Sequence, residues 1–275
     1  MKNSITILFS LLIPFFALSQ VSSSEKQALK SLYKATNGDA WTNTWNLNTP
    51  VSNWYGVTVE NNHVVSLQLH MNNLDGEIPN QLKKLIYLKH LNLGFNKLSG
   101  ELPKSIGELS NLESLELFMN KLEGEIPESL VNLKKLKVIK LYSNTLEGII
   151  PETLMSLKNL KELSLGSNHL TGTIPTSVGE LVQLEKLILL DNHLEGHIPI
   201  EIGQLKSLKE LVLSSNNLTG VLPFEVARLR HLEIMMVSDN NLEKEYVTVT
   251  GKSTPPGLQI IPEDEGMIAT DYFDD

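Results

Sequence analysis

Residues 112–133 read LESLELFMNKLEGEIPESLVNL, and this stretch decides the fold. Leu115 and Leu117 alternate with polar or variable residues, a period of two that predicts a short β-strand. Gly124 permits a turn that a side chain would obstruct. Pro127 fixes φ, removes a backbone donor and begins a return segment of the form Pro-x-x-Leu-x-x-Leu. That segment is too short for a regular helix, so we predict a 3₁₀ turn or a single helical turn.

The pattern recurs along most of the chain with a constant spacing of 24 residues. The spacing is carried by asparagines at Asn72, Asn96, Asn120, Asn144, Asn168, Asn192, Asn216 and Asn240. A glycine follows four positions later, from Gly76 to Gly220, and a proline seven positions later, from Pro79 to Pro223. Such a repeat cannot bury its apolar face alone, which predicts stacked coils.

We therefore predict an α/β solenoid in the form of a horseshoe, with one short strand in each coil. Neighbouring strands would pair in parallel on the concave face, about 4.8 Å apart, and the 3₁₀ or short helical turns would form the convex face. Each asparagine lies where the chain leaves the sheet, and its amide both donates and accepts. We expect a structural ladder that bridges the backbones of neighbouring coils; the alternative is a polar binding ladder.

The chain divides into four predicted segments. Residues 1–19 resemble a signal peptide, because Lys2 precedes an apolar run and small residues precede a cleavage point after Ser19. Residues 20–63 form an N-terminal cap, 64–242 the repeats (eight coils, the last one partial) and 243–275 a C-terminal cap or acidic tail. The apolar run is too short to span a membrane, which takes about 20 residues, so we expect no membrane span in the mature chain.

Helical and aromatic residues mark the N-terminal cap. Ser24 is predicted to cap a helix over about 25–36, before Trp41, Trp45 and Trp54. The end coil of a solenoid exposes an apolar face, and tryptophans suit its cover because each buries a large area. The alternative for the same residues is an aromatic platform for a glycan.

The C-terminal segment is acidic, with eight acidic residues against two lysines over 243–275. Residues 246–250 favour a last strand, which Pro255 and Pro256 would end. The acidic residues lack the regular spacing of a calcium loop.

Composition excludes several classes of function. The net charge of −9 argues against nucleic acid and against an anionic membrane surface as partners. The absence of cysteine excludes disulfides and thiolate chemistry. No catalytic or cofactor-binding motif is present, so we predict that the chain is not an enzyme and takes no cofactor or metal. His193 and His197 have helical spacing but fall on a predicted turn, so with His169 they are better explained as exposed histidines than as a metal site.

The variable strand positions carry the information about function, because their side chains should point to solvent. Two apolar patches result. The first patch is Met71, Phe95, Phe118, Met119 and Tyr142, and the second patch is Ile188, Leu190, Val212 and Met236, with Ile234 beside it. Exposed apolar patches usually mark interaction sites. The alternatives are that the first covers the sheet edge and that the tail folds over the second.

The motif Leu-x-x-Leu-x-Leu-x-x-Asn-x-Leu-x-Gly-x-Ile-Pro, over about 65–242, resembles the leucine-rich repeat family. Its Gly-x-Ile-Pro part, as at Gly124–Pro127, resembles the subclass of plant receptor-kinase ectodomains and secreted bacterial proteins. Residues 52–59, SNWYGVTV, resemble the cap motif of that family, in which cysteines usually stand where Ser52 and Val59 stand here. This departure favours the cysteine-free bacterial versions.

The resemblance implies that peptides, proteins or glycans bind the concave face or its edge. We therefore predict a secreted, periplasmic or cell-surface binding protein that recognises a protein or peptide through its concave face. The alternative is a glycan-binding or adhesive envelope protein.

Overall fold

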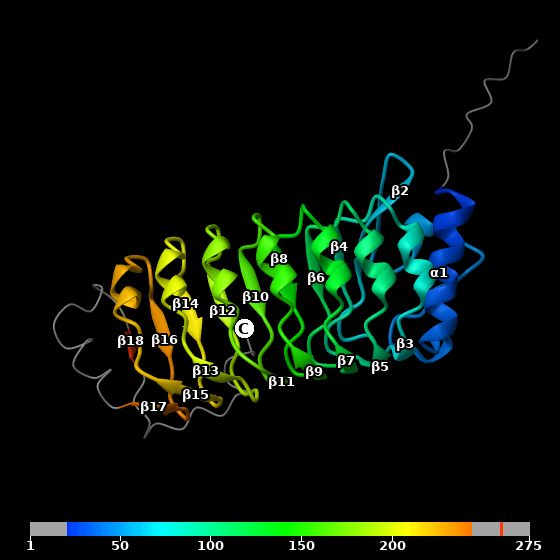
Figure 1. Ribbon diagram of the computed structural model, residues 1–275. Coiled ribbons are helices and arrows are strands. Elements are labelled where there is room, and N and C mark those ends of the chain that lie inside the picture. The colour runs from blue at the N-terminus through cyan, green and yellow to red at the C-terminus, as the bar shows by residue number, and fades with distance from the viewer. Residues whose placement is uncertain (1–20, 244–258, 261–275) are drawn as a thin grey trace, which may run out of the picture.

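The computed structural model describes residues 21–243 and 259–260. Over these residues the coils stack side by side in one row, with helix α1 across the N-terminal end (Figure 1). The predicted signal peptide at 1–19 and the predicted strand at 246–250 lie outside the described residues. No helix in the described part of the chain is long and apolar enough to cross a membrane.

The first strand of each coil joins one sheet, which we call the concave sheet. Leu91 pairs with Leu115, and Leu115 with Ile139, so equivalent positions of successive repeats lie side by side. Its neighbours are parallel except for the antiparallel pair β1–β2. This confirms the predicted sheet. In spatial order the strands are β1 (Val57–Glu60), β2 (His63–Gln68), β4 (His90–Asn92), β6 (Ser114–Glu116), β8 (Val138–Lys140), β10 (Glu162–Ser164), β12 (Lys186–Ile188), β14 (Glu210–Val212), β16 (Ile234–Met236) and β18 (Gln259–Ile260).

A second strand follows the asparagine in each coil, so the prediction of one strand per coil was wrong. The glycine of the repeat has a left-handed φ, 75° at Gly124. A Cβ on Gly124 would lie 3.0 Å from Cγ of Glu101 in the preceding coil, so the glycine also permits close stacking. The strands pair in parallel as β3 (Asp75–Glu77), β5 (Lys97–Glu101), β7 (Lys121–Glu125), β9 (Thr145–Ile149) and β11 (His169–Thr171), then as β13 (Glu195–His197), β15 (Asn217–Gly220) and β17 (Asn241–Leu242).

The return segments are 3₁₀ helices, as predicted. The repeat proline is the N-cap each time, with φ −67° and ψ 129° at Pro127, and the next leucine of the motif, Leu130, is buried. The segments are η3 (Asn80–Lys84), η4 (Lys104–Glu108), η5 (Glu128–Asn132), η6 (Glu152–Ser156), η7 (Thr176–Glu180), η8 (Ile200–Gln204) and η9 (Phe224–Arg228).

The core is a stack of leucines supplied by equivalent repeat positions. In the coil quoted above, Leu115, Leu117, Leu122, Leu130 and Leu133 are all fully buried. Burying one such side chain is worth about 1.5–3 kcal/mol relative to leaving it exposed. The motif leucines therefore account for the stability of the stack, and the ligand must be sought at other positions.

The N-terminal cap closes the first coil. Helix α1 (Ser23–Ala35) begins earlier than predicted, because the side chain of Ser22, not Ser24, accepts the hydrogen bond from the Glu25 amide. The short helices η1 (Gly38–Ala40) and η2 (Val51–Asn53) follow. All three tryptophans are buried and pack ring against ring, Trp45 stacking on Trp54 at 4.8 Å. They cover the core as predicted, and the alternative of a glycan platform is wrong because their faces are not accessible.

A buried carboxylate fastens the cap helix to the concave sheet. Glu25 Oε1 accepts the backbone N–H of Val64 at 3.0 Å, and Oε2 accepts the Ser22 hydroxyl at 2.8 Å. Oε2 also lies 3.3 Å from Nδ1 of His63, whose ring stacks on Tyr87. These contacts join the cap to the first two coils.

Candidate functional site

The asparagine ladder bonds to backbone throughout. Asn120 Oδ1 accepts the N–H of Leu98 at 2.9 Å, and Nδ2 donates to the carbonyls of Leu93 and Leu117, each at 3.0 Å. Leu93 and Leu98 belong to the preceding coil. Asn72, at the first coil, accepts the N–H of Asn43 at 2.7 Å and so ties the ladder to the cap. The fold uses the hydrogen-bonding groups of these amides. The candidate site is therefore sought among the variable residues of the concave sheet and of the turns that follow its strands.

The first patch is exposed at one end and buried at the other. Met71 is 62% exposed and Phe95 is 47% exposed, whereas Phe118 and Met119 are half-buried. Tyr142 is buried, with 8% exposure, so the expectation that it points freely to solvent was wrong. The accessible part of this patch is therefore the row formed by Met71, Phe95 and Met119.

The backbone of this row is unusual for such large side chains. Met71, Phe95 and Met119 have φ of 53°, 54° and 51°, in the left-handed region. All later coils share this conformation, but they carry serine or aspartate at the equivalent positions: Ser143, Ser167, Asp191, Ser215 and Asp239. Left-handed backbone is uncommon for residues other than glycine, asparagine and aspartate, and retained strain is typical of functional positions. The fold needs this turn but does not need Met or Phe in it.

Phe118 and Tyr142 form the base of the patch. Their ring centroids are 4.9 Å apart and the planes differ by 14°. The Phe118 ring also lies against Gly94, where a Cβ would approach its Cε1 and Cζ to 2.5 Å. Glycine in the preceding coil thus leaves the space that the ring fills.

A row of alternating charges crosses the centre of the concave sheet. Lys140 Nζ lies 4.0 Å from Glu116 and 3.6 Å from Glu162, and Lys186 lies 2.6 Å from Glu210. This charge row was not predicted from the sequence, although opposite charges recur one coil apart in the aligned repeats. A ligand bound on the first patch would therefore have the polar side chains of the charge row as neighbours.

Burial and the charge row change two pKa values. Burial raises the pKa of Glu162 above its usual value, although Lys140 and Lys186 oppose the shift. Burial, with the negative charges of Glu162 and Glu116, raises the pKa of Tyr142 to about 12. Tyr142 therefore keeps its proton at neutral pH and stays an uncharged part of the site.

The second patch is not an accessible surface. Ile188, Leu190 and Val212 are buried, and Ile234 and Met236 pack against them. Ile188, Val212 and Met236 are in register on adjoining strands, so their branched or long side chains cover one another. The expectation that Ile188, Leu190 and Val212 face solvent was wrong, whereas Met236 and Ile234 are half-buried at the edge of this cluster. We do not include the second patch in the candidate site.

The three histidines do not converge. The rings of His169 and His193 are 5.8 Å apart and tilted by 45°, while Nδ1 of His197 lies 3.2 Å from the carbonyl oxygen of Thr219. All three side chains are exposed. Among the described residues no group of three or more histidines and acidic side chains is placed to hold a metal ion.

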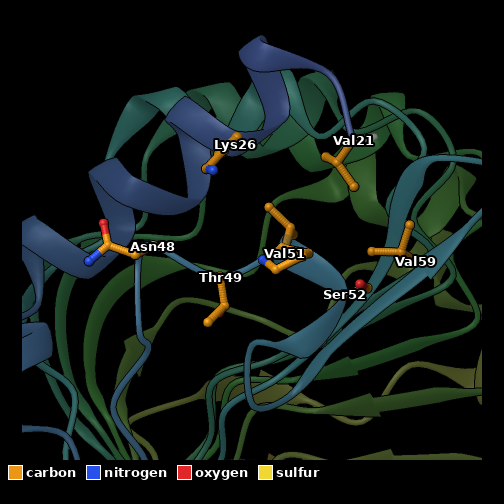
Figure 2. A pocket seen from close by; sticks show the side chains of 8 residues that line it. Val21, Lys26, Asn48, Thr49, Val51, Ser52 and Val59 are labelled. Carbon is orange, nitrogen blue, oxygen red and sulfur yellow. The ribbon is translucent and has the colours of Figure 1, made fainter. Parts of the chain in front are cut away.

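The cap contains a hollow of about 230 Å³ beneath the start of α1. Figure 2 shows Val21, Lys26, Asn48, Thr49, Val51, Ser52 and Val59 around it. Ser52 and Val59, the positions at which the resembled cap motif carries cysteines, both line this hollow. Apart from one lysine, the hollow is lined by aliphatic and uncharged polar residues, which do not form a catalytic or binding group. The first patch remains the stronger candidate site.

The sequence matches two family models. A model described as a leucine-rich repeat region covers residues 60–197, about half of the chain, and a leucine rich repeat model covers residues 207–229. None of the curated proteins matches the sequence.

Three solved plant structures share the fold. One is the ectodomain of the Arabidopsis thaliana membrane receptor kinase GASSHO1/SCHENGEN3 in complex with CASPARIAN STRIP INTEGRITY FACTOR 2, with 37% identity over 86% of this chain and 29% of that chain and a TM-score of 0.81. The Arabidopsis receptor kinase HAESA ectodomain, in complex with an N-terminally extended IDA peptide hormone, is 30% identical over 86% of this chain and 40% of that chain, with a TM-score of 0.77. A plant ice-binding protein is 29% identical over 88% of this chain and 78% of that chain, with a TM-score of 0.79.

The chain therefore spans less than half the length of these two receptor ectodomains. Because the same fold serves both peptide receptors and an ice-binding protein, the fold alone does not identify the ligand. The ligand is determined by the side chains that this chain carries at the candidate site.

Proposed function

The chain belongs to the leucine-rich repeat family, and from this premise we propose that it is an exported binding protein that holds a peptide or protein segment on the first four coils of its concave sheet. The observation that carries the proposal is the row of Met71, Phe95 and Met119. These bulky apolar residues occupy a left-handed turn that needs only serine or aspartate in the later coils, and two of them are strongly exposed.

The shape of the site favours an extended chain as ligand. The distance from the coil of Met71 to that of Tyr142 is three coil steps, or about 14 Å, which about four or five extended residues would cover. Apolar side chains of the ligand would lie against Met71, Phe95 and Met119, as is typical of interface cores. The charge row that starts at Glu116 offers polar contacts at the end of this segment.

Two further observations support the proposal. The receptor ectodomains named above were solved with CASPARIAN STRIP INTEGRITY FACTOR 2 and a peptide hormone bound, respectively. The start of the chain, with Lys2 before an apolar run, is typical of export. Binding rather than catalysis is the role that we assign to the site, because its accessible surface consists of thioether and aromatic groups.

The test is a selection of random peptides on the full chain, followed by titration of the enriched peptides. The variant Met71→Ser with Phe95→Ser introduces the residue that later coils carry at these positions. We expect it to weaken binding by at least about tenfold, equivalent to 1.4 kcal/mol, without lowering the melting temperature. Truncating Tyr142 would be a poorer test, because that side chain is buried.

The matched control is Ser167→Ala with Ser215→Ala, at the same repeat position in later coils. This control should bind the enriched peptides like the parent chain. Equal binding by the Met71→Ser, Phe95→Ser variant would show that the peptides bind elsewhere, and the proposal would then be wrong.

A further inference from the structure

The only two arginines of the chain, Arg228 and Arg230, line one surface hollow in the last complete coil. The hollow has a volume of about 470 Å³, and its other lining residues are Lys206, Ala227 and His231. It lies at the end of η9 and in the turn that follows, outside the concave sheet. The chain has a net charge of −9, yet no acidic residue is among those that line this hollow.

Comparison with an earlier coil shows what has changed here. Two repeats before Lys206 and Arg228, the equivalent residues are Lys158 and Glu180, and these two form an ion pair between coils. In the last coil arginine replaces the glutamate. A lysine and an arginine thus occupy positions that an attractive pair fills elsewhere, and like charges repel unless an anion lies between them.

The residues that the structure describes neutralise only part of this charge. Arg228 Nη2 lies 3.8 Å from Glu225 in a contact of its own helix, and Lys206 donates a hydrogen bond to the carbonyl oxygen of Gly203. Within 21–243 and 259–260, no carboxylate lies within 4.0 Å of the charged nitrogens of Lys206 or Arg230. In the described part of the chain, one carboxylate therefore faces three permanent cations.

We propose that this hollow binds a single phosphate or sulfate group carried on an otherwise uncharged molecule such as a sugar. A guanidinium presents its donors in a planar fork that fits two oxygens of such a group, and charge-assisted hydrogen bonds of this kind are the strong ones. Two guanidinium groups and an ammonium around one opening supply the donors that a tetrahedral oxyanion needs.

The surroundings of the hollow favour one discrete anionic group over an anionic surface. Glu225 and Glu233 flank the cationic residues in sequence, and the whole chain is acidic. A bilayer of anionic lipids or a densely charged polymer would meet this acidic surface and be repelled. A single phosphate or sulfate on a neutral carrier can enter the hollow without this repulsion.

The experiment is calorimetric titration of the full chain with inorganic phosphate, with glucose 6-phosphate and with glucose, supported by the NMR signals of the arginine Nε–H groups. Both phosphates should bind and shift these signals, and glucose should not bind. The variant Arg228→Gln with Arg230→Gln should weaken binding by at least about tenfold.

The chain offers a matched control in Lys134→Gln with Lys135→Gln. Lys134 stands at the repeat position of Lys206 and Arg230, and Lys135 at that of His231, so the same charge is removed from an equivalent turn. This control should bind phosphate like the parent chain. Equal loss in both variants would overturn the proposal, because it would show a response to net charge rather than to the hollow.

A second variant separates binding from folding. Arg228→Glu reproduces the pair of Lys158 with Glu180, so it should abolish phosphate binding while the melting temperature stays equal to that of the parent chain or rises. Added phosphate should raise the melting temperature of the parent chain only. Binding to phosphatidylglycerol vesicles without binding to glucose 6-phosphate would overturn the proposal in favour of a membrane surface.

Discussion

The ring of Phe118 stacks on that of Tyr142 in the next coil, with centroids 4.9 Å apart and planes inclined by 14°. The stack covers the phenol ring and holds it near Glu116 and Glu162. The stack forms the base of the proposed binding site, and burial together with the negative charges of Glu162 and Glu116 raises the pKa of the Tyr142 phenol within it.

The tyrosine titration provides the first prediction. Because burial raises the pKa of Tyr142 from 10.0 to about 12, this tyrosine should ionise well after the exposed ones. Its contribution to stability is complete below the pKa of an unfolded tyrosine and is lost as the pH rises from about 10 toward 12. Tyrosinate absorbance against pH should show a late step that Tyr142→Phe diminishes; the pKa of Tyr33 is raised as well, so Tyr33 also ionises after the exposed tyrosines. A parent chain without that late step would contradict the stacked, buried geometry.

Two glutamates should respond to pH in opposite directions. The hydrogen bond from Lys137, at 2.7 Å, lowers the pKa of Glu113. Ionised Glu113 therefore stabilises the fold above the pKa of an unfolded glutamate, and this stabilisation is lost as the pH falls. Burial raises the pKa of Glu162, so its contribution is present at low pH and is lost as pH rises. The two substitutions should therefore change the pH dependence of unfolding with opposite signs.

Urea unfolding from pH 3 to pH 7 would measure this. Glu113→Gln should be less stable than the parent chain at pH 7, by less than about 1 kcal/mol for so accessible a pair, and equal to it at pH 3. Glu162→Gln should gain stability relative to the parent chain as the pH rises. The same sign for both variants would refute the assigned causes.

The asparagine ladder predicts a larger effect on stability. Asn120→Ala removes the acceptor of the Leu98 N–H in the preceding coil and one of the two amide donors to the Leu93 carbonyl, which keeps its hydrogen bond from Asn96. The Leu98 N–H is therefore the backbone group that loses its partner. The expected loss is about 1–3 kcal/mol in the free energy of unfolding, measured with urea. The exposed neighbour Lys121→Ala is the control and should change little. An unchanged unfolding midpoint in Asn120→Ala would show that the ladder contributes nothing to stability.

The repeat made much of the fold predictable. The position within the 24-residue repeat is enough to identify Leu115, Leu117 and Asn120 as interior residues, because equivalent residues of successive coils have the same surroundings. The second strand at Lys121–Glu125 was not predictable in this way. The pairing of this strand depends on how closely two coils approach. That approach depends on Gly124, which lies against the Glu101 side chain of the preceding coil.

The candidate site was harder to predict, because exposure is decided by neighbours on other coils. Val212, in β14, and Tyr142, two residues after β8, were expected to point away from the core, yet both are buried by adjoining side chains. To predict the charge row from Glu116 to Glu210, the repeats have to be aligned and the residues of neighbouring coils compared with one another. Met71 and Phe95 were predictable, since small residues replace them in the later coils.

The last prediction concerns the glycine beneath the aromatic stack. A Cβ at Gly94 would lie 2.5 Å from the Phe118 ring, so Gly94→Ala should displace the ring at a cost of about 1–3 kcal/mol. The displaced ring would expose Tyr142, whose late titration step should then move toward ordinary tyrosine behaviour. Gly166→Ala, at the same repeat position with its nearest contact 3.2 Å away, is the matched control and should leave that step unchanged.

Combining the substitution with Phe118→Ala separates this ring clash from a backbone effect. If the clash is with the Phe118 ring, truncating the ring removes it, and the double variant should lose less stability than the sum of the two single losses. Additive losses would mean that Gly94 is required by the backbone, and the Phe118–Tyr142 stack would then not depend on the space that Gly94 leaves.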